Sequence, residues 1–276
     1  MFKFIFALTA SFLAAVSLPQ FYNTSVSAYV TENSKSKVEN NLSDEDLNAL
    51  DNNCLGYGQG HECDNNNRPL CAANFNAMYS IYDGYAMLDS DDKICITFDQ
   101  GYENGYTPAI LDTLKEKEAK AVFFLTGDYA ERNPELVKRM IDEGHIIGNH
   151  GLDHASLPKL SLAEAESEIM ELHNFVADKY GYEMTYFRPP CGEYSERSIA
   201  LAQRLGYKTF LWSFAYCDWD PNDQPNPQKA FEKITKAAHG GEILLLHSVS
   251  KTNCEILGSV IDDLRAQGYE ISLPSI

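Results

Sequence analysis

The sequence has few basic residues for its length. Its 276 residues include 22 Lys and Arg against 40 Asp and Glu, which gives a formal net charge of −18. A nucleic-acid-binding surface needs clustered basic side chains that replace the counterions around phosphates. An anionic membrane surface attracts basic segments in the same way. The charge balance therefore excludes nucleic acid as a partner and argues against docking on an anionic bilayer surface.

Long apolar runs are also scarce. A membrane-spanning helix needs about 20 consecutive apolar residues, whereas the uncharged N-terminal run 4–18 has 15. This run follows Lys3 and precedes small residues at 26–28, which is the pattern of a secretory signal peptide. We therefore assign residues 1–28 to a signal peptide or to an uncleaved N-terminal anchor. Either leader predicts an extracytoplasmic protein, secreted or tethered to the membrane.

The spacing of the seven cysteines does not match a zinc knuckle or ribbon. Because the number is odd, at least one thiol stays outside any internal disulfide. Cys54, Cys63 and Cys71 lie in a polar, Asn-rich stretch, where export would permit pairing among them. Cys95 alternates with apolar residues and is expected to be a small buried side chain.

Residues 29–92 lack hydrophobic periodicity. They are acidic, and Gly, Asn and Pro interrupt them, most densely in the stretch 53–69. We expect an acidic linker followed by a loop-rich extension that wraps the main domain. From Lys93 onward, strand-like and helix-like patterns alternate to the end of the chain. Residues 93–276 are therefore expected to form the main domain.

Seven short segments of this main domain have the length and the apolar, β-branched content of strands. They are 93–98, 120–125, 145–149, 185–188, 207–212, 242–247 and 269–273. Helical patterns lie between them, and Ser161-x-x-Glu164 and Thr252-x-x-Glu255 are capping boxes that predict two of the helix starts. Alternating strands and helices imply right-handed βαβ units and a parallel sheet.

The main domain is short for a complete barrel. About 180 residues do not accommodate eight full βα units comfortably. We therefore expect an α/β fold built as a distorted, incomplete (β/α) barrel of about seven parallel strands. An open doubly wound sheet is the alternative, but the G-x-G-x-x-G fingerprint expected after its first strand is missing.

Ionisable side chains follow five of the seven predicted strands. In parallel α/β folds, the carboxyl ends of the strands form the functional site. Core packing does not explain five ionisable groups at the same end of the strands, because a buried ionisable group is costly unless it is paired. The five groups are Asp99, His150, Arg188, Asp218 and His247.

His154 lies four residues after His150. If this segment makes a helical turn, both imidazoles lie on one face and can hold one divalent metal ion. Two imidazoles leave coordination positions open, and a catalytic metal needs open positions to bind water and polarise a carbonyl. The spacing therefore predicts a catalytic metal site.

The remaining groups suit acid–base chemistry. Asp99 is either a further ligand or a general base, and His247 is a candidate general acid. Asp218 would fix the tautomer of His247 and raise its pKa. Arg188 would pair with Asp99 and keep it ionised. Together these residues predict metal-assisted hydrolysis of an amide or ester.

The motifs TFDQG, HGLDH, RPPCG, CDW and LLLHSV, in this order, resemble the five motifs of the NodB-type polysaccharide deacetylases. The resemblance covers about residues 93–273 and implies that 93–276 is a catalytic deacetylase domain. It implies a distorted (β/α) barrel and a divalent-metal hydrolase that removes N- or O-acetyl groups from sugars. The resemblance assigns the base to Asp99, the metal ligands to His150 and His154, the acid to His247, and supporting roles to Arg188 and Asp218. The main-chain N–H of Cys191 would help to hold the oxyanion.

The first motif departs from the family pattern. The family usually has two adjacent aspartates there, whereas this chain has Gln100 in the second place. An amide oxygen can still coordinate a hard ion, although with less charge than a carboxylate. The expected cofactor is one divalent ion, which is zinc, or manganese or magnesium.

Within the family, GYENGYTP, GHIIGNH, DWDPNDQ and LHSVSKTN resemble the delta-lactam-biosynthetic deacetylases. Those enzymes act on N-acetylmuramic acid in spore-cortex peptidoglycan after an amidase has removed the peptide, and they tolerate a non-acidic residue after the first aspartate. The resemblance implies peptidoglycan glycan strands as partner and the cell wall or spore cortex as location.

Two alternatives stay open. One is a deacetylase of chitooligosaccharides, of peptidoglycan N-acetylglucosamine or of acetylxylan. The other is a non-catalytic sugar-binding module whose metal site is degraded at Gln100. The sequence leaves the oligomeric state open.

Four aromatic residues near the motif ends are candidates for substrate binding. Aromatic faces suit the apolar C–H surfaces of sugar rings, whereas packing at the rim of the core is the alternative explanation for each of them. The four are Tyr102, Tyr106, Tyr194 and Trp219.

Overall fold

The computed structural model describes residues 42–275. The leader assigned to 1–28 and the first part of the acidic linker lie outside the described residues. Within the part of the chain that the structure describes, no helix combines the length and apolar character needed to cross a membrane.

All seven predicted strands are present, and they belong to one sheet of parallel strands. They are β3 (Lys93–Gln100), β4 (Ala121–Leu125), β5 (Ile146–Asn149), β6 (Tyr186–Phe187), β8 (Lys208–Phe210), β9 (Glu242–His247) and β10 (Glu270–Ile271). A further strand, β2 (Gly84–Tyr85), pairs with β8. Sequence patterns miss β2 because two residues carry no periodicity.

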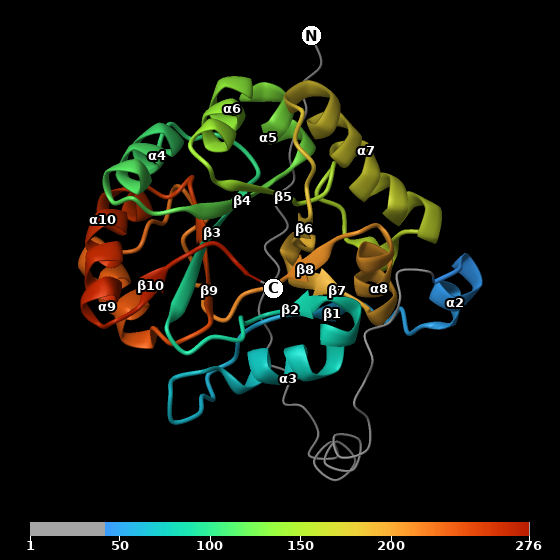
Figure 1. Ribbon diagram of the computed structural model, residues 1–276, viewed down its shortest axis with the longest axis horizontal. Helices are drawn as coiled ribbons and strands as arrows, with labels where there is room; N and C mark the ends of the chain where they lie inside the picture. Colours follow the sequence, from blue (N-terminus) through green and yellow to red (C-terminus); the bar gives the residue numbers. More distant parts are fainter. Residues whose placement is uncertain (1–41, 276) are drawn as a thin grey trace. The chain divides into compact units, whose positions relative to one another are not determined.

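Strand β3 lies between β4 and β9, and it pairs with three strands of the sheet (Figure 1). Residues 94–99 of β3 pair with β9 on one edge, while β4 and β10 pair with different parts of the other edge. From β4 the order continues through β5, β6 and β8 to β2. Beyond β8, Phe214 bridges to Leu244 of β9, which brings the two sides of the sheet together. The result is a curled half-barrel, which confirms the predicted distorted and incomplete barrel.

Helices cover the outside of this curled sheet (Figure 1). They are α4 (Thr107–Glu116), α5 (Gly127–Arg132), α6 (Pro134–Asp142), α7 (Leu162–Tyr180), α8 (Glu196–Arg204), α9 (Pro227–Ala237) and α10 (Lys251–Ala266). The predicted capping box of Ser161 begins α7. The second box was wrong, because α10 is capped by Ser250, whose hydroxyl accepts the N–H of Asn253 at 3.1 Å.

The described part of the extension, 42–92, packs on the sheet domain. It contains α2 (Asp44–Ala49), β1 (Leu55–Gly56), α3 (Leu70–Tyr79), the 3-10 turn η1 (Ser80–Tyr82) and β2. Strand β1 pairs antiparallel with β7 (Glu193–Tyr194). The Tyr57 ring lies 5.3 Å from that of Trp212, and its hydroxyl donates to the Trp212 carbonyl at 2.8 Å. The extension is therefore more regular than a set of loops, while its boundary with the catalytic domain stays a prediction.

All seven cysteines lie in the described residues, and all are free thiols. The pairing that export would permit among Cys54, Cys63 and Cys71 does not occur. Cys95 is fully buried, as predicted.

The concave side of the sheet is filled by a compact apolar cluster. Its buried members are Leu88, Cys95, Val122, Phe124, Tyr186, Phe210 and Ile243. Gly148 of β5 has no side chain where the Phe124 ring passes, and a Cβ there would collide with that ring. The ring in turn supports Arg188, whose guanidinium carbon lies 4.1 Å from the ring centroid. This cluster forms the floor beneath the polar residues at the strand ends.

A buried carboxyl group lies at the opposite end of the sheet, at the start of β9. The Glu242 side chain is 1% exposed and accepts the His239 N–H at 3.3 Å, and its second oxygen has no partner among the described residues. Burial raises the pKa of Glu242 to about 8 and lowers that of His239, so both groups are neutral near pH 7.

We expect Glu242 to make the stability of the fold depend on pH. The folded carboxyl keeps its proton up to about pH 8, whereas the unfolded one releases it above its ordinary pKa. The contribution of Glu242 to stability therefore falls as pH rises from about 4.5 to 8, by about 3 kcal/mol at pH 7. Glu242→Gln should remove this contribution, so the difference in stability between the variant and the wild type should change with pH by this amount. Urea unfolding of both proteins across that pH range measures it, and a difference that does not change with pH would contradict the assignment.

Candidate active site

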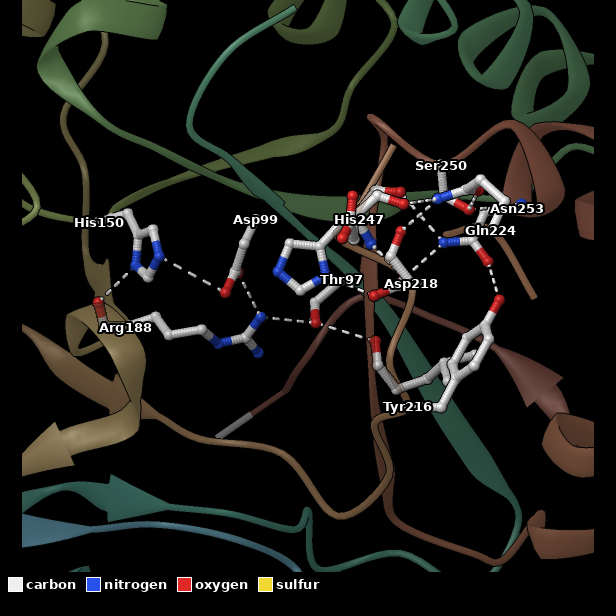
Figure 2. Close-up of polar contacts among 12 residues, drawn as sticks. Thr97, Asp99, His150, Arg188, Tyr216, Asp218, Gln224, His247, Ser250 and Asn253 are labelled. Atoms are coloured by element: carbon white, nitrogen blue, oxygen red, sulfur yellow. Dashed lines mark hydrogen bonds and ion pairs between the residues drawn. The ribbon is translucent and has the colours of Figure 1, made fainter. Parts of the chain in front are cut away.

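Strand β3 carries two polar side chains onto the concave face of the sheet. Thr97 and Asp99 are two residues apart, so strand geometry places their side chains on the same face. Arg188, just after β6, is fully buried and contacts both. Its Nη1 donates to Asp99 Oδ1 at 2.8 Å and to Thr97 Oγ1 at 2.9 Å. These contacts bring together two side chains of β3 and one from the segment just after β6 (Figure 2).

The Arg188 guanidinium is held by more than the ion pair. Its Nε and Nη2 donate to the carbonyls of Phe210 and Leu211, each at 3.1 Å. A charged group in this position is stable because its donors are satisfied by oxygen atoms. The guanidinium therefore has a fixed position beneath Asp99.

Asp99 is ionised in this environment. Burial alone would raise its pKa, but the adjacent Arg188 guanidinium, with help from His150 and His247, holds the pKa of the Asp99 carboxyl below its ordinary value. The side chain is 8% exposed, so its free oxygen lies at the boundary of the site. A carboxylate of this kind can accept a proton from a nucleophile.

His150 lies on the other side of Asp99 (Figure 2). Its Nδ1 is 2.8 Å from the Arg188 carbonyl oxygen, which fixes Nδ1 as the N–H donor of the neutral ring. Its Nε2 lies 3.5 Å from Asp99 Oδ2 and carries the lone pair. Burial lowers the pKa of His150 to about 4, so the imidazole is neutral at pH 7. A neutral ring oriented through its second nitrogen is the usual state of a metal ligand.

The segment from His150 to His154 is not the helical turn that the spacing predicts. It is an irregular loop in which Gly151 has φ +83° and His154 has φ +59°. Glu168 of α7 holds it, because its Oε1 accepts the N–H groups of Asp153 at 2.9 Å and Ala155 at 3.0 Å. The loop still brings the His150 and His154 rings to a centroid distance of 4.8 Å.

Burial lowers the pKa of His154 as well, so both imidazoles beside the Asp99 carboxylate are neutral at pH 7. Two such rings fit a divalent ion with open coordination positions. Among residues 42–275, no group of three His, Cys, Asp or Glu side chains is arranged as a complete metal site. The Gln100 oxygen, predicted as a ligand, accepts the Ser248 hydroxyl, and the buried Nε2 of Gln100 has no partner in the part of the chain that the structure describes. His150 and His154 are therefore the donors that fit best, and ligation by Gln100 stays a prediction.

His247 and Asp218 form a second pair, on the side of Asp99 away from His150 (Figure 2). His247 Nδ1 lies 2.8 Å from Asp218 Oδ1, and the His247 main-chain N–H donates to Asp218 Oδ2, also at 2.8 Å. Burial would lower the pKa of His247, but the fully buried Asp218 carboxylate outweighs it and raises that pKa. His247 therefore holds a proton more firmly than an ordinary histidine.

The predicted aromatic residues take different positions. Trp219 is 53% exposed, and its ring centroid lies 5.9 Å from that of His247. Tyr102 is 47% exposed, whereas Tyr106 is half-buried. Trp219 is therefore next to the acid–base residues and free to meet a ligand.

Tyr194 and Cys191 lie on the segment that follows Arg188. The Tyr194 ring packs against Phe75 at 5.3 Å and Tyr79 at 5.5 Å, so it joins β7 to α3. In the described residues, no hydrogen bond or ring contact links it to the Asp99 group, and its role in substrate binding stays a prediction. Cys191 is exposed and has φ +58°, an uncommon backbone conformation for a residue with a side chain.

Sequence reasoning missed three residues that hold the site. Thr97 could have been found from the sequence, because residues two apart on a strand place their side chains on the same face, and Asp99 is two residues on. Glu168 and Asn253 lie on α7 and α10, outside the strand ends where the candidates were sought. Asn253 was inside the quoted motif LHSVSKTN, but nothing in that motif shows where its side chain points.

Comparison with known proteins matches this site to a family. Residues 88–210 match the family model described as polysaccharide deacetylase. Peptidoglycan-N-acetylmuramic acid deacetylase PdaA of Bacillus subtilis is 41% identical over 207 residues, which are 74% of this chain and 79% of PdaA. The chain belongs to the polysaccharide deacetylase family.

Solved structures of this deacetylase family agree. Bacillus subtilis PdaA, described as a family 4 carbohydrate esterase, superposes with a TM-score of 0.76 and 38% identity, covering 80% of this chain and 95% of PdaA. A family 4 carbohydrate esterase from Bacillus anthracis superposes with a TM-score of 0.67 and 36% identity, covering 81% of this chain and 95% of that protein. In the sequence comparison, a peptidoglycan-N-acetylglucosamine deacetylase of Bacillus cereus is 35% identical, over 68% of this chain and 89% of that protein. This chain is thus a family 4 deacetylase.

Proposed function

We propose that this deacetylase removes N-acetyl groups from peptidoglycan sugars, and that its substrate is N-acetylmuramic acid in muramic delta-lactam formation. The observation that carries the chemistry is the pair of contacts at the site: Arg188 Nη1 donates to Asp99 Oδ1 at 2.8 Å, and Asp218 Oδ1 lies 2.8 Å from His247 Nδ1. These partners lower the pKa of Asp99 and raise that of His247. Two neighbouring titratable groups whose pKa values are pushed apart can serve as base and acid in one reaction.

In the proposed reaction, Asp99 accepts a proton from the attacking water while Arg188 keeps the carboxylate ionised. His247 then donates a proton to the leaving nitrogen, and Asp218 holds the imidazole so that Nε2 faces the substrate. The acetyl group leaves as acetate and the sugar keeps a free amine. The main-chain N–H of Cys191 would donate to the oxyanion of the tetrahedral intermediate.

The residues that would hold a divalent ion are His150 and His154. Such an ion, when bound, supplies Lewis-acid polarisation of the acetyl carbonyl. Glu168 would contribute by fixing the loop between the two histidines. Zinc, manganese and magnesium all suit a site of this kind.

The substrate proposal is supported by the relatives. PdaA, which is named as a peptidoglycan-N-acetylmuramic acid deacetylase, is 41% identical to this chain. Relatives named for N-acetylglucosamine are 31–36% identical, and a second relative named for N-acetylmuramic acid, PdaC of Bacillus subtilis, is 30% identical. Peptidoglycan N-acetylglucosamine is therefore the second candidate, and either substrate agrees with the proposed export through 1–28 to the cell wall or spore cortex.

The test is acetate release from defined glycans. The purified protein, equilibrated with zinc, manganese or magnesium, is incubated with peptidoglycan glycan strands whose peptides an amidase has removed, and separately with chitooligosaccharides. We expect acetate from the glycan strands, with mass spectrometry placing the free amine on muramic acid. Turnover of chitooligosaccharides with untouched muramyl residues would reject the muramic assignment. Absence of acetate with every ion would favour the sugar-binding alternative.

A further inference from the structure

The Asn253 side chain contacts both residues of the acid pair, Asp218 and His247. Asn253 lies in the first turn of α10, directly after the loop that follows β9, and is 1% exposed. Its Nδ2 donates to Asp218 Oδ2 at 2.6 Å and to the His247 carbonyl oxygen at 3.1 Å. Its Oδ1 accepts the hydroxyl of Tyr216. Figure 2 shows this side chain next to Asp218, on the side away from Asp99.

The orientation of the Asn253 amide is fixed by chemistry. Asp218 and the His247 carbonyl can only accept, so the amide nitrogen must face them. Burial raises the pKa of Tyr216, so its phenol keeps the proton that it donates to Asn253 Oδ1. Both amide hydrogens and the amide oxygen are thus used, and no other orientation satisfies all three neighbours.

The backbone of Asn253 is fixed as well. Its N–H donates to the Ser250 hydroxyl at 3.1 Å, and that hydroxyl donates to Gln224 Oε1 at 2.7 Å. Gln224 Nε2 in turn donates to the Asp218 carbonyl at 3.0 Å. The start of α10 and the segment that carries Asp218 are therefore joined by a closed set of hydrogen bonds.

We propose that Asn253 is a positioning residue for the reaction, which holds the Asp218 carboxylate in the plane that directs Oδ1 at His247 Nδ1. Asp218 Oδ2 has two described donors, the His247 main-chain N–H and the Asn253 amide. Without the amide, the carboxylate keeps one anchor on that oxygen and can turn about its own bond. His247 Nδ1 then loses a fixed acceptor. Asn253 acts through Asp218 and need not touch the substrate.

The first experiment needs no substrate, so it decides this inference whatever becomes of the proposed function. In protein labelled with ¹⁵N-histidine, the His247 Nδ1 proton is identified by its absence in His247→Ala, and its exchange with water is measured. A proton held by a buried carboxylate should exchange slowly. Asn253→Ala should accelerate exchange by roughly tenfold or more, and Tyr216→Phe, which removes the anchor on Oδ1, should do so less strongly.

The matched control is Thr252→Val. Thr252 is the neighbouring residue on α10, is 3% exposed, and donates to the Pro225 carbonyl at 2.7 Å. This change removes a buried hydrogen bond from the same helical turn without a contact to Asp218. Exchange at His247 should match the wild type. Equal exchange in Asn253→Ala and wild type, or equal acceleration by Thr252→Val, would overturn the proposal.

The second experiment is kinetic and rests on the proposed function. Asn253→Ala should lower kcat for acetate release by roughly 10- to 100-fold, the scale of one hydrogen bond to a charged group, with KM unchanged. In an Asp218→Ala background the same change should have little further effect, because the group that it positions is gone. If the reductions in kcat from the two substitutions multiplied in the double variant, Asn253 would not act through Asp218. A wild type without activity would reject the proposed function alone, since proton exchange still decides the role of Asn253.

Discussion

Asp99→Asn is expected to lower kcat/KM for acetate release by roughly 10²- to 10⁴-fold, the range over which a general base contributes. Asparagine has nearly the same shape as aspartate, but its amide cannot take a proton from water. The Arg188 guanidinium keeps Thr97 and two carbonyl oxygens as acceptors, so the variant should fold. Its melting temperature should fall, because a buried charge loses its counter-ion.

The control for this prediction is Asp178→Asn, which removes the same charge from an exposed position on α7. Initial rates and circular dichroism melting curves of both variants separate loss of the base from loss of the fold. The control should behave as the wild type in both measurements. Activity of Asp99→Asn within a factor of two of the wild type would show that another group serves as the base.

His247→Ala is expected to reduce kcat by a similar factor, roughly 10²- to 10⁴-fold, because the leaving nitrogen loses its proton donor. Its effect on the bound divalent ion should differ from that of replacing a metal ligand. The divalent ion content measured after equilibration should match the wild type in His247→Ala and fall in His150→Ala. Loss of the ion in His247→Ala would mean that this histidine is a ligand.

The pH dependence of Asp218→Asn tests the same acid. The general acid must be protonated, so kcat/KM falls as pH rises through the pKa of His247. In the wild type Asp218 raises that pKa, which moves this alkaline limb to higher pH. Without the carboxylate, His247 loses its proton sooner, and the limb should move to lower pH. If the alkaline fall in kcat/KM stayed at the same pH in Asp218→Asn, that fall would report the titration of a group other than His247.

The fold was predictable where short-range patterns encode it. The apolar runs that became β3, β4 and β9 are long enough to read as buried strands, and the Ser161 capping box sets the start of α7. Strand β2 was missed because its pairing with β8 is a long-range contact between two very short segments. Nor does periodicity place β9 beside β3, because strand order depends on how the whole sheet curls.

The site was predictable for a related reason. Parallel strands deliver their terminal residues to one edge, so Asp99, His150 and His247 could be grouped before any geometry was known. The residues that hold these groups in place could not be predicted, because Glu168 and Asn253 reach the site from helices. The His150–His154 segment was wrongly expected to be helical, since its spacing fits a helical turn while Gly151 and Glu168 shape it into a loop.

The central claim is that one divalent ion, held by His150 and His154 beside the Asp99 carboxylate, acts with that base. Anomalous scattering from crystals equilibrated with zinc or manganese tests it most directly. A single peak is expected within about 2.0–2.2 Å of a ring nitrogen from each histidine. A peak held by other residues, or none at an ion concentration that supports full activity, would contradict the account.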